Sequence, residues 1–247
     1  MAASELTAES EPATGRGPAG RSELVRRGAE VAAASDAAIG EGRRSRARRG
    51  EGGRLREDIL AAAEELLLAS GDAGSLSIRA IATAVGVTPP SIYLHFADRN
   101  ELVFEVCDRK WRELAALLDA AVEGLADPLE RIECRGRAYM DFGVTHPEHY
   151  RVLLGSRLDQ IPDSYADQAL LTDRLGFAPL VADLRAAMDA GQLTPADPWE
   201  LCRVLFSAIH GLTSMLVRGT GPDWPSNERL VDRMIDTLMW GIRPRPT

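Results

Sequence analysis

The chain has 247 residues, a formal net charge of −8 and a hydrophobic content of 45%. This length accommodates one large or two small domains with a substantial buried core. The longest apolar runs, such as residues 66–69, are far too short to span a bilayer, and the acidic N-terminus does not resemble a secretory signal. We therefore expect a cytoplasmic globular protein that does not bind a membrane.

Three cysteines, Cys107, Cys134 and Cys202, are scattered along the chain without a C-x-x-C spacing. An odd, sparse set of this kind indicates reduced, mostly buried thiols rather than a disulfide framework. No pattern around them marks a reactive thiolate, so a redox sensor is only an alternative interpretation.

The negative charge is unevenly distributed. Residues 41–100 carry nine arginines and eight acidic residues, whereas residues 101–247 carry sixteen basic and twenty-three acidic residues. The acidity therefore lies mainly in the second part of the chain, and the total charge does not exclude binding of nucleic acid by the first part.

Residues 1–50 are rich in small and charged residues, and we expect this N-terminal extension to be disordered. It ends in a basic run: Arg43, Arg44, Arg46, Arg48 and Arg49. The run is either a solvated tail, which a translation start placed too early would also explain, or an arm that neutralises DNA phosphates or enters the minor groove.

Residues 54–70 predict a first helix with one apolar stripe, and Gly71 is a natural stop. Residues 76–102 then predict two short helices and the start of another. Ser77 is a suitable N-cap, Gly86 breaks the apolar run where the chain turns, and Thr88-Pro89 begins the next helix. This is the pattern of a helix-turn-helix, although a simple helical hairpin without a DNA role fits it equally well.

The residues that follow decide between these interpretations. They form the motif Y-x-H-F-x-x-R-x-x-L: Tyr93, His95, Phe96, Arg99 and Leu102. With the preceding helices, this motif resembles the N-terminal domain of TetR-family transcriptional regulators over about residues 54–105. The resemblance implies an all-α fold: a three-helix DNA-binding domain with a helix-turn-helix, followed by a larger helical domain for ligand binding and dimerisation.

The resemblance also implies which side chains contact DNA: Ser77, Arg79, Thr88, Pro89, Pro90, Ser91, Tyr93, His95 and Arg99. The recognition helix is expected over residues 88–94, with its first four residues facing the groove and Tyr93, His95 and Arg99 on phosphates. Arg79 is the best candidate for reading guanine, because its guanidinium matches O6 and N7. Two prolines leave the reading surface few hydrogen-bonding groups, so DNA shape should contribute to selectivity.

The remaining chain predicts helices throughout. A long helix starts at Asp98, where Asp98 and Glu101 have capping-box spacing, and runs to about Ala121. Further helices are expected over residues 128–145, 147–155 and 198–218 and from 226 to about 240, with one or two between 162 and 191 interrupted near 176–179. The resulting domains are the extension 1–50, the helix-turn-helix domain 51–98 and the helical body 99–247.

The last two predicted helices are strongly apolar, and in TetR-like proteins such helices form the dimer interface. The stretch HPEHYRVLLG and the His210-Gly211 pair also resemble, loosely, one actinobacterial-type TetR subclass. Candidate effector-binding residues in this body are Arg137, Tyr139, Phe142, Tyr150 and His210. These side chains fit a mixed pocket, but they fit core and surface positions equally well.

No pattern indicates catalysis. The chain lacks a G-x-S-x-G motif and a phosphate-binding glycine loop, so we expect neither an enzyme nor a cofactor. His146 and His149 have a spacing found in metal sites, but Pro147 interrupts the helix and no third ligand is near, so no metal is expected.

The sequence therefore predicts a dimeric repressor that binds a palindromic double-stranded DNA operator and is released by an unidentified small molecule. Two alternatives remain. One is a helical dimerisation or scaffold protein with a vestigial helix-turn-helix, and the other is a regulator that senses metal or redox state through His146, His149 or a cysteine.

Overall fold

The computed structural model describes residues 52–71, 73–155, 176–219, 221 and 224–244, and all regular structure in these ranges is helical. The elements in chain order are α2 (Gly52–Ser70), η1 (Ala73–Ser75), α3 (Ile78–Val85), α4 (Pro89–Ile92), α5 (Arg99–Ala121), α6 (Pro128–Thr145), α7 (Pro147–Gly155), α9 (Phe177–Asp189), α10 (Pro198–Arg218) and α11 (Asn227–Ile242). The all-α prediction is confirmed. The predicted N-terminal extension, with its basic run, lies outside the described residues.

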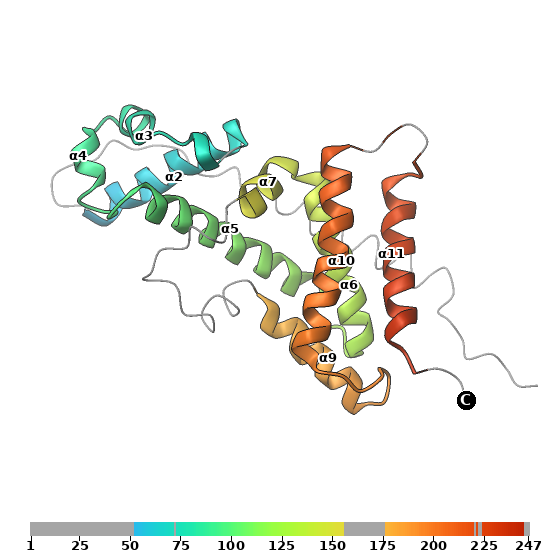
Figure 1. The fold of residues 1–247 in the computed structure, drawn as a ribbon. Helices are drawn as coiled ribbons and strands as arrows, with labels where there is room; N and C mark the ends of the chain where they lie inside the picture. The colour runs from blue at the N-terminus through green and yellow to red at the C-terminus, as the bar shows by residue number, and fades with distance from the viewer. Residues whose placement is uncertain (1–51, 72, 156–175, 220, 222–223, 245–247) are drawn as a thin grey trace, which may run out of the picture.

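Helices α2, α3 and α4 form one end of the molecule, and the long helix α5 connects them to the body (Figure 1). Their core consists of apolar side chains from all four helices, with Ile59, Ile81, Ile92 and Leu102 inaccessible to solvent. Gly86 ends α3 with a φ of 78°, a left-handed conformation that glycine adopts without strain, and its N–H donates to the Ala82 carbonyl. The predicted turn of the helix-turn-helix is therefore present.

The predicted capping box fixes the start of α5. The Asp98 side chain accepts a hydrogen bond from the Glu101 N–H at 2.8 Å, and the Glu101 carboxylate accepts one from the Ala97 N–H. The first bond satisfies an amide that the helix start leaves without a helical partner, and the second ties the residue before the N-cap to the first turn. The direction in which α5 leaves the DNA-binding end is set at this cap.

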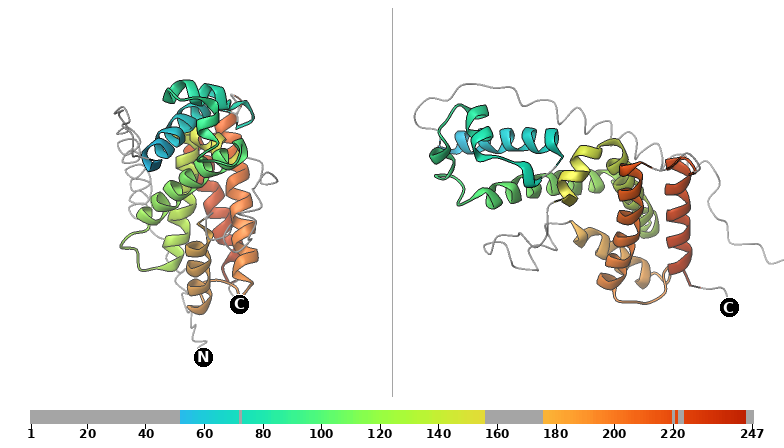
Figure 2. Two further views of the ribbon diagram at one scale, coloured as in Figure 1. Left: turned by 90° about the vertical axis from the view of Figure 1, so that its left-hand side faces the viewer. Right: turned by 45° about the horizontal axis from the view of Figure 1, so that its top comes forward.

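Helix α6 lies at the centre of the body and packs against α5, α9, α10 and α11. Helices α10 and α11 stand side by side at the end of the molecule away from α2 (Figures 1 and 2). The structure gives α6, α7 and α10 the bounds that the sequence predicts, and α11 extends two residues further, to Ile242. Proline at the first position of α6 and α10 accounts for their clear starts, because the missing N–H would have no helical partner there.

Helix α9 begins within the range 176–179, where the sequence predicts an interruption. Gly176 has a φ of 69° and precedes α9, which begins at Phe177. Any helix expected between residues 162 and 175 lies outside the described part of the chain.

Helix α7 lies between the two ends of the molecule (Figure 1). Its Val152 side chain is buried in the core of the DNA-binding end, and the Val152 carbonyl lies 3.9 Å from the Cys107 thiol of α5. The α5 residues Leu102 and Val106 belong to the same core. The core beneath the helix-turn-helix therefore includes residues on both sides of the predicted boundary at residue 98.

Helix α10 is, among the described residues, the one helix long and apolar enough to cross a membrane. By itself this is weak evidence, since core helices of soluble proteins pass the same test. In this structure α10 packs its buried side chains against α6, α9 and α11. We interpret it as a core helix.

Candidate functional site: a DNA-reading surface and an apolar cavity

The recognition helix α4 is shorter than predicted. It spans Pro89–Ile92 instead of residues 88–94, and a turn follows in which the N–H groups of His95 and Phe96 both donate to the Ile92 carbonyl. Burial explains the shape, because Ile92 and Phe96 point into the core and draw the chain back towards the cap of α5. The reading surface is thus one helical turn and the loop after it.

Most of the predicted DNA contacts lie on the surface. Five of them are exposed: Ser77, Arg79, Thr88, Pro90 and Tyr93. Pro89, Ser91, His95 and Arg99 are partly buried. Sequence reasoning omitted Leu94, which is 83% exposed beside Tyr93 and is therefore a further candidate for apolar contact with DNA. The sequence held one signal for Leu94: it is an apolar residue in a motif whose other positions are core residues or DNA contacts.

The short hydroxyl side chains on this surface do not form capping hydrogen bonds with the protein backbone. Ser77 and Thr88 precede α3 and α4 as expected, but neither side chain makes a capping hydrogen bond. The Thr88 hydroxyl instead lies 2.9 Å from the Ser91 hydroxyl. These short hydroxyl side chains are consequently available for phosphates or base edges.

Two arginines near the surface have structural partners. The Arg99 Nε donates to the Leu76 carbonyl at 2.7 Å and so joins the start of α5 to the residue before α3. Arg56 forms an ion pair with Glu105 and lies over the Phe96 ring, 4.9 Å from its centroid. Arg99 therefore positions the helix-turn-helix, and its contact with phosphate stays a prediction.

The body contains an apolar cavity of about 710 Å³, including the part open to solvent. Side chains from α5, α6, α9, α10 and α11 line it: Trp111, Leu118, Ile132, Glu133, Arg135, Gly136, Tyr139, Gly176, Phe177, Leu180, Leu205, Phe206, Ile209, Ile235, Leu238 and Met239. The wall is almost entirely apolar, as in most small-molecule sites. Four aromatic rings form part of its wall.

The two charged residues of the wall are paired within the protein. Arg135 is buried and donates to Asp183 at 3.0 Å and to Asp119 at 2.7 Å. Glu133 accepts a hydrogen bond from Arg243 at 3.1 Å. The two charged residues of the cavity wall are therefore already neutralised by partners within the protein.

Three of the predicted effector residues come together beside this cavity. The hydroxyls of Tyr139 and Tyr150 lie 3.1 Å and 2.8 Å from the same nitrogen, His210 Nδ1, and Phe206 stacks on the His210 ring. Burial raises the pKa of Tyr150 to about 12 and the pKa of Tyr139 further still, and it lowers the pKa of His210. The cluster is therefore neutral at physiological pH. Of the three, only Tyr139 lines the cavity itself.

The other two predicted effector residues lie elsewhere. Arg137 forms an ion pair with Asp232 of α11, and Phe142 stacks on His146 at a centroid distance of 5.2 Å. Neither lines the cavity. The prediction grouped them with Tyr139 as residues that could line a mixed pocket, but these positions of α6 face different neighbours.

His146 and His149 are close to each other in the structure. His146 and His149 are both buried, with ring centroids 5.8 Å apart. Within the described ranges, no group of three or more histidine, cysteine or acidic residues is placed to hold an ion. The three cysteines are buried, and none is joined to another by a disulfide.

Both parts of the chain match known protein families. Residues 59–106 match bacterial regulatory proteins of the tetR family, and residues 134–238 match the tetracyclin repressor-like C-terminal domain. The chain belongs to the TetR family. It is accordingly a DNA-binding transcriptional regulator with an N-terminal DNA-binding domain and a larger helical domain.

Solved structures share this fold. A Rhodococcus sp. RHA1 protein of unknown function is 27% identical, with a TM-score of 0.66, over 80% of this chain and all of that one. A putative TetR-family regulator from Vibrio parahaemolyticus is 22% identical, with a TM-score of 0.63, over 77% of this chain and 99% of that one. RolR, solved in complex with resorcinol, is 17% identical, with a TM-score of 0.57, over 79% of this chain and 90% of that one. This TetR-family regulator thus shares its fold with these solved structures.

Proposed function

We propose that the protein is a cytoplasmic homodimeric repressor that leaves a palindromic operator when a small molecule occupies the cavity. The observation that carries this proposal is the course of α5. This helix contributes Trp111 and Leu118 to the cavity wall, and Leu102 and Val106 to the core beneath the helix-turn-helix. A displacement of α5 by a ligand would be transmitted directly to the DNA-reading surface.

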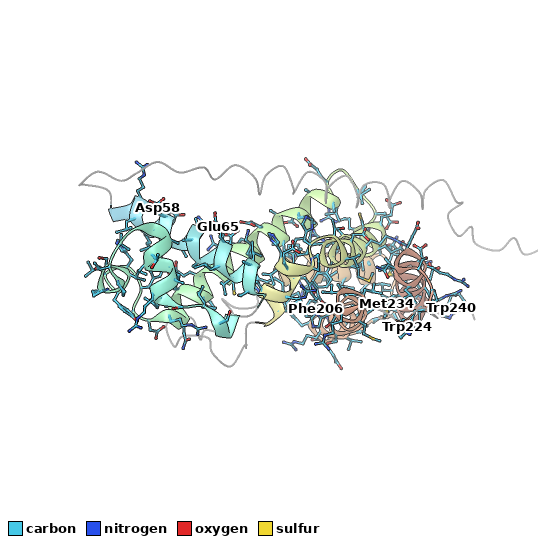
Figure 3. All side chains as sticks on the ribbon, turned by 90° about the horizontal axis from the view of Figure 1, so that it is seen from above. Asp58, Glu65, Phe206, Trp224, Met234 and Trp240 are labelled. Atoms are coloured by element: carbon cyan, nitrogen blue, oxygen red, sulfur yellow. The ribbon has the colours of Figure 1, made fainter. Side chains whose placement is uncertain are left out.

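Dimerisation is supported by the outer face of α10 and α11. Val204 and Met215 of α10 are exposed, and Trp240 of α11 is 79% exposed at the end of the molecule away from α2 (Figure 3). Large apolar side chains exposed on two adjacent helices are groups that an interface would bury. A two-fold dimer would present two recognition helices to half-sites roughly 34–36 Å apart, or a multiple of this spacing.

Release by a ligand requires only a modest coupling energy. A coupling of about 1–3 kcal/mol weakens operator binding by roughly 5–150-fold. RolR, which shares the fold, was solved with the small aromatic ligand resorcinol, and this supports a small molecule as the effector.

The test begins with selection of DNA sequences by the full chain from a random double-stranded library at moderate salt. A palindromic consensus is expected, and fluorescence anisotropy then measures affinity for it. Arg79→Ala combined with Tyr93→Ala should lower this affinity by about 100-fold, because one base contact and one phosphate contact are lost. Arg185→Ala, at an exposed position of α9, is the control and should leave it unchanged.

Circular dichroism and sedimentation must show the same fold and dimer for both variants. Absence of any sequence preference in the wild-type protein would contradict the repressor and favour a scaffold with a vestigial helix-turn-helix. Loss of DNA affinity on adding a chelator or an oxidant would instead favour a metal or redox sensor.

A further inference from the structure

We propose that the cavity selects an uncharged aromatic molecule and rejects charged molecules of the same shape. This inference rests on the proposed function, because it names the chemical class of the effector. Three features of the cavity carry it: its aromatic walls, the internal pairing of its two charged residues, and the engagement of its tyrosine hydroxyl.

The aromatic rings come from four different helices. Trp111, Tyr139, Phe177 and Phe206 belong to α5, α6, α9 and α10. Phe206 makes edge-to-face contacts with Tyr139 and Phe177 at centroid distances of 5.6 Å and 4.9 Å. Rings arranged in this way offer both faces and edges to a further ring, the contact that aromatic groups favour. Most of the remaining wall is aliphatic.

In this wall a charged ligand would meet only charged groups that already have partners. Arg135 already faces Asp183 and Asp119, and Glu133 already faces Arg243. An anion would have to share Arg135 with the two carboxylates that already bind it, and a cation would have to share Glu133 with the guanidinium of Arg243. Either ion would lose its hydration on entering an apolar site, a cost that only a new opposite charge could offset.

The tyrosine hydroxyl of the wall is also engaged. The Tyr139 hydroxyl lies 3.1 Å from His210 Nδ1, and His210 does not line the cavity. Tyr139 therefore contributes mainly its ring to the wall while its polar end has a partner outside. The ligand that fits this surface is neutral and largely apolar.

The test compares three ligands that share one naphthalene ring system: 2-naphthol, 2-naphthoate and 2-naphthylmethylammonium. Isothermal titration calorimetry with the full chain at pH 7.5 measures each affinity. We expect 2-naphthol to bind at least about 100-fold more tightly than either charged compound, because only the charged compounds lose uncompensated hydration. Binding of either ion as tight as that of 2-naphthol, or no difference among the three, would overturn the proposal.

Two variants locate the binding. Ile209→Trp fills the cavity from α10 and should abolish 2-naphthol binding, whereas Arg185→Trp adds the same side chain at an exposed position of α9 and should not. If Ile209→Trp does not fold, Phe206→Leu removes one ring while keeping an apolar side chain, and it should weaken binding about 10-fold. Unchanged binding in a folded Ile209→Trp, or in Phe206→Leu where that variant is used instead, would place the ligand elsewhere and overturn the proposal.

Operator binding without ligand separates this proposal from the function on which it rests. A protein that binds its operator but does not distinguish the three compounds is a regulator with a different class of effector. A protein that selects 2-naphthol but shows no DNA sequence preference has the cavity chemistry proposed here without the proposed repressor function.

Discussion

The DNA-reading surface and the cavity of this regulator are built in opposite ways. On the reading surface, side chains such as Arg79 and Tyr93 are exposed, and a short stretch of chain supplies all of them. Around the cavity, Arg135 and Tyr139 are buried and engage residues 48 and 71 positions away in the chain. The first arrangement can change its contacts without disturbing the fold, whereas the second holds the fold together.

This contrast has a thermodynamic consequence. Substitutions on the reading surface should alter affinity for DNA and leave the free energy of unfolding nearly unchanged, because few protein contacts are lost. Substitutions around the cavity should alter the free energy of unfolding first. The following predictions test this division, beginning with the largest expected effect.

Asp183→Ala should lower the free energy of unfolding by about 3 kcal/mol. Asp183 is buried and accepts hydrogen bonds from Arg131 at 2.6 Å and Arg135 at 3.0 Å, so its removal leaves a buried guanidinium partly uncompensated. Urea denaturation measures the change. Asp119→Ala removes the other partner of Arg135, a carboxylate that is 54% exposed, and should cost less than about 1 kcal/mol. Equal losses of unfolding free energy in the two variants would show that the burial of Asp183 does not determine how much its pairing with Arg135 stabilises the protein.

Gly143→Ala should lower the free energy of unfolding by about 2–3 kcal/mol. A Cβ at Gly143 would collide with the Thr213 side chain of α10 and come within 2.9 Å of the Tyr150 ring of α7, so helices must move apart. Thermal and urea denaturation measure the loss. The matched control is Gly53→Ala in α2, where nothing lies within 4 Å, and it should stabilise the protein by up to about 1 kcal/mol. A neutral Gly143→Ala would mean that α6, α7 and α10 are more loosely packed than the structure indicates.

Asp141→Asn should raise the free energy of unfolding by about 1–2 kcal/mol at pH 8 and have little effect near pH 4. Burial raises the pKa of Asp141 to about 6; the charge of Arg137 opposes this, and the charges of Asp232 and Glu228 add to it. The folded state therefore retains a proton that the unfolded chain loses, and ionisation costs stability as the pH rises from about 4 to 6.

The measurement for Asp141→Asn is a series of urea denaturations from pH 4 to pH 8 on the variant and the wild type. The two curves should converge near pH 4, separate as the pH rises from about 4 to 6, and stay a constant distance apart above pH 6. A constant difference at every pH would show that the substitution acts by something other than this titration.

Asp98→Ala should lower the free energy of unfolding by about 1 kcal/mol, the usual value of an N-cap. Its side chain accepts the Glu101 N–H at the start of α5. Ser77 occupies the same position before α3 but makes no capping hydrogen bond, so Ser77→Ala should leave the free energy of unfolding unchanged and reduce only DNA affinity. A destabilising Ser77→Ala would contradict the division between the two regions.

Local sequence signals predicted the helices well, for physical reasons. Proline at the first position of α6 and α10, the Asp98–Glu101 cap and the positive φ of Gly86 all act within a few residues. The length of the recognition helix was predicted less well. It depends on how Ile92 and Phe96 reach the core, which is a tertiary property.

The cavity could be predicted only in part. Tyr139 and His210 were selected as polar residues on apolar helices, and they do meet beside it. Trp111, Phe177 and Phe206 were missed because an aromatic residue on an apolar stripe looks the same whether it fills a core or borders a space. Glu133 is neutralised by Arg243, which lies 110 positions later in the chain. No local sequence pattern predicts a contact between residues so far apart.

The position of Val152 has a consequence for protein engineering. Regulators of this kind are attractive components of biosensors in which the DNA-binding domain of one protein is fused to the ligand-binding domain of another. Here Val152, which belongs to the ligand-binding domain, packs in the core of the DNA-binding domain, and its carbonyl lies beside the Cys107 thiol. A fusion made within α5 would therefore join the backbone correctly and still leave a hole under the helix-turn-helix, unless the new body brings a side chain of matching shape. Compatibility between the DNA-binding domain and the ligand-binding domain should follow the residue at position 152 more closely than overall sequence similarity.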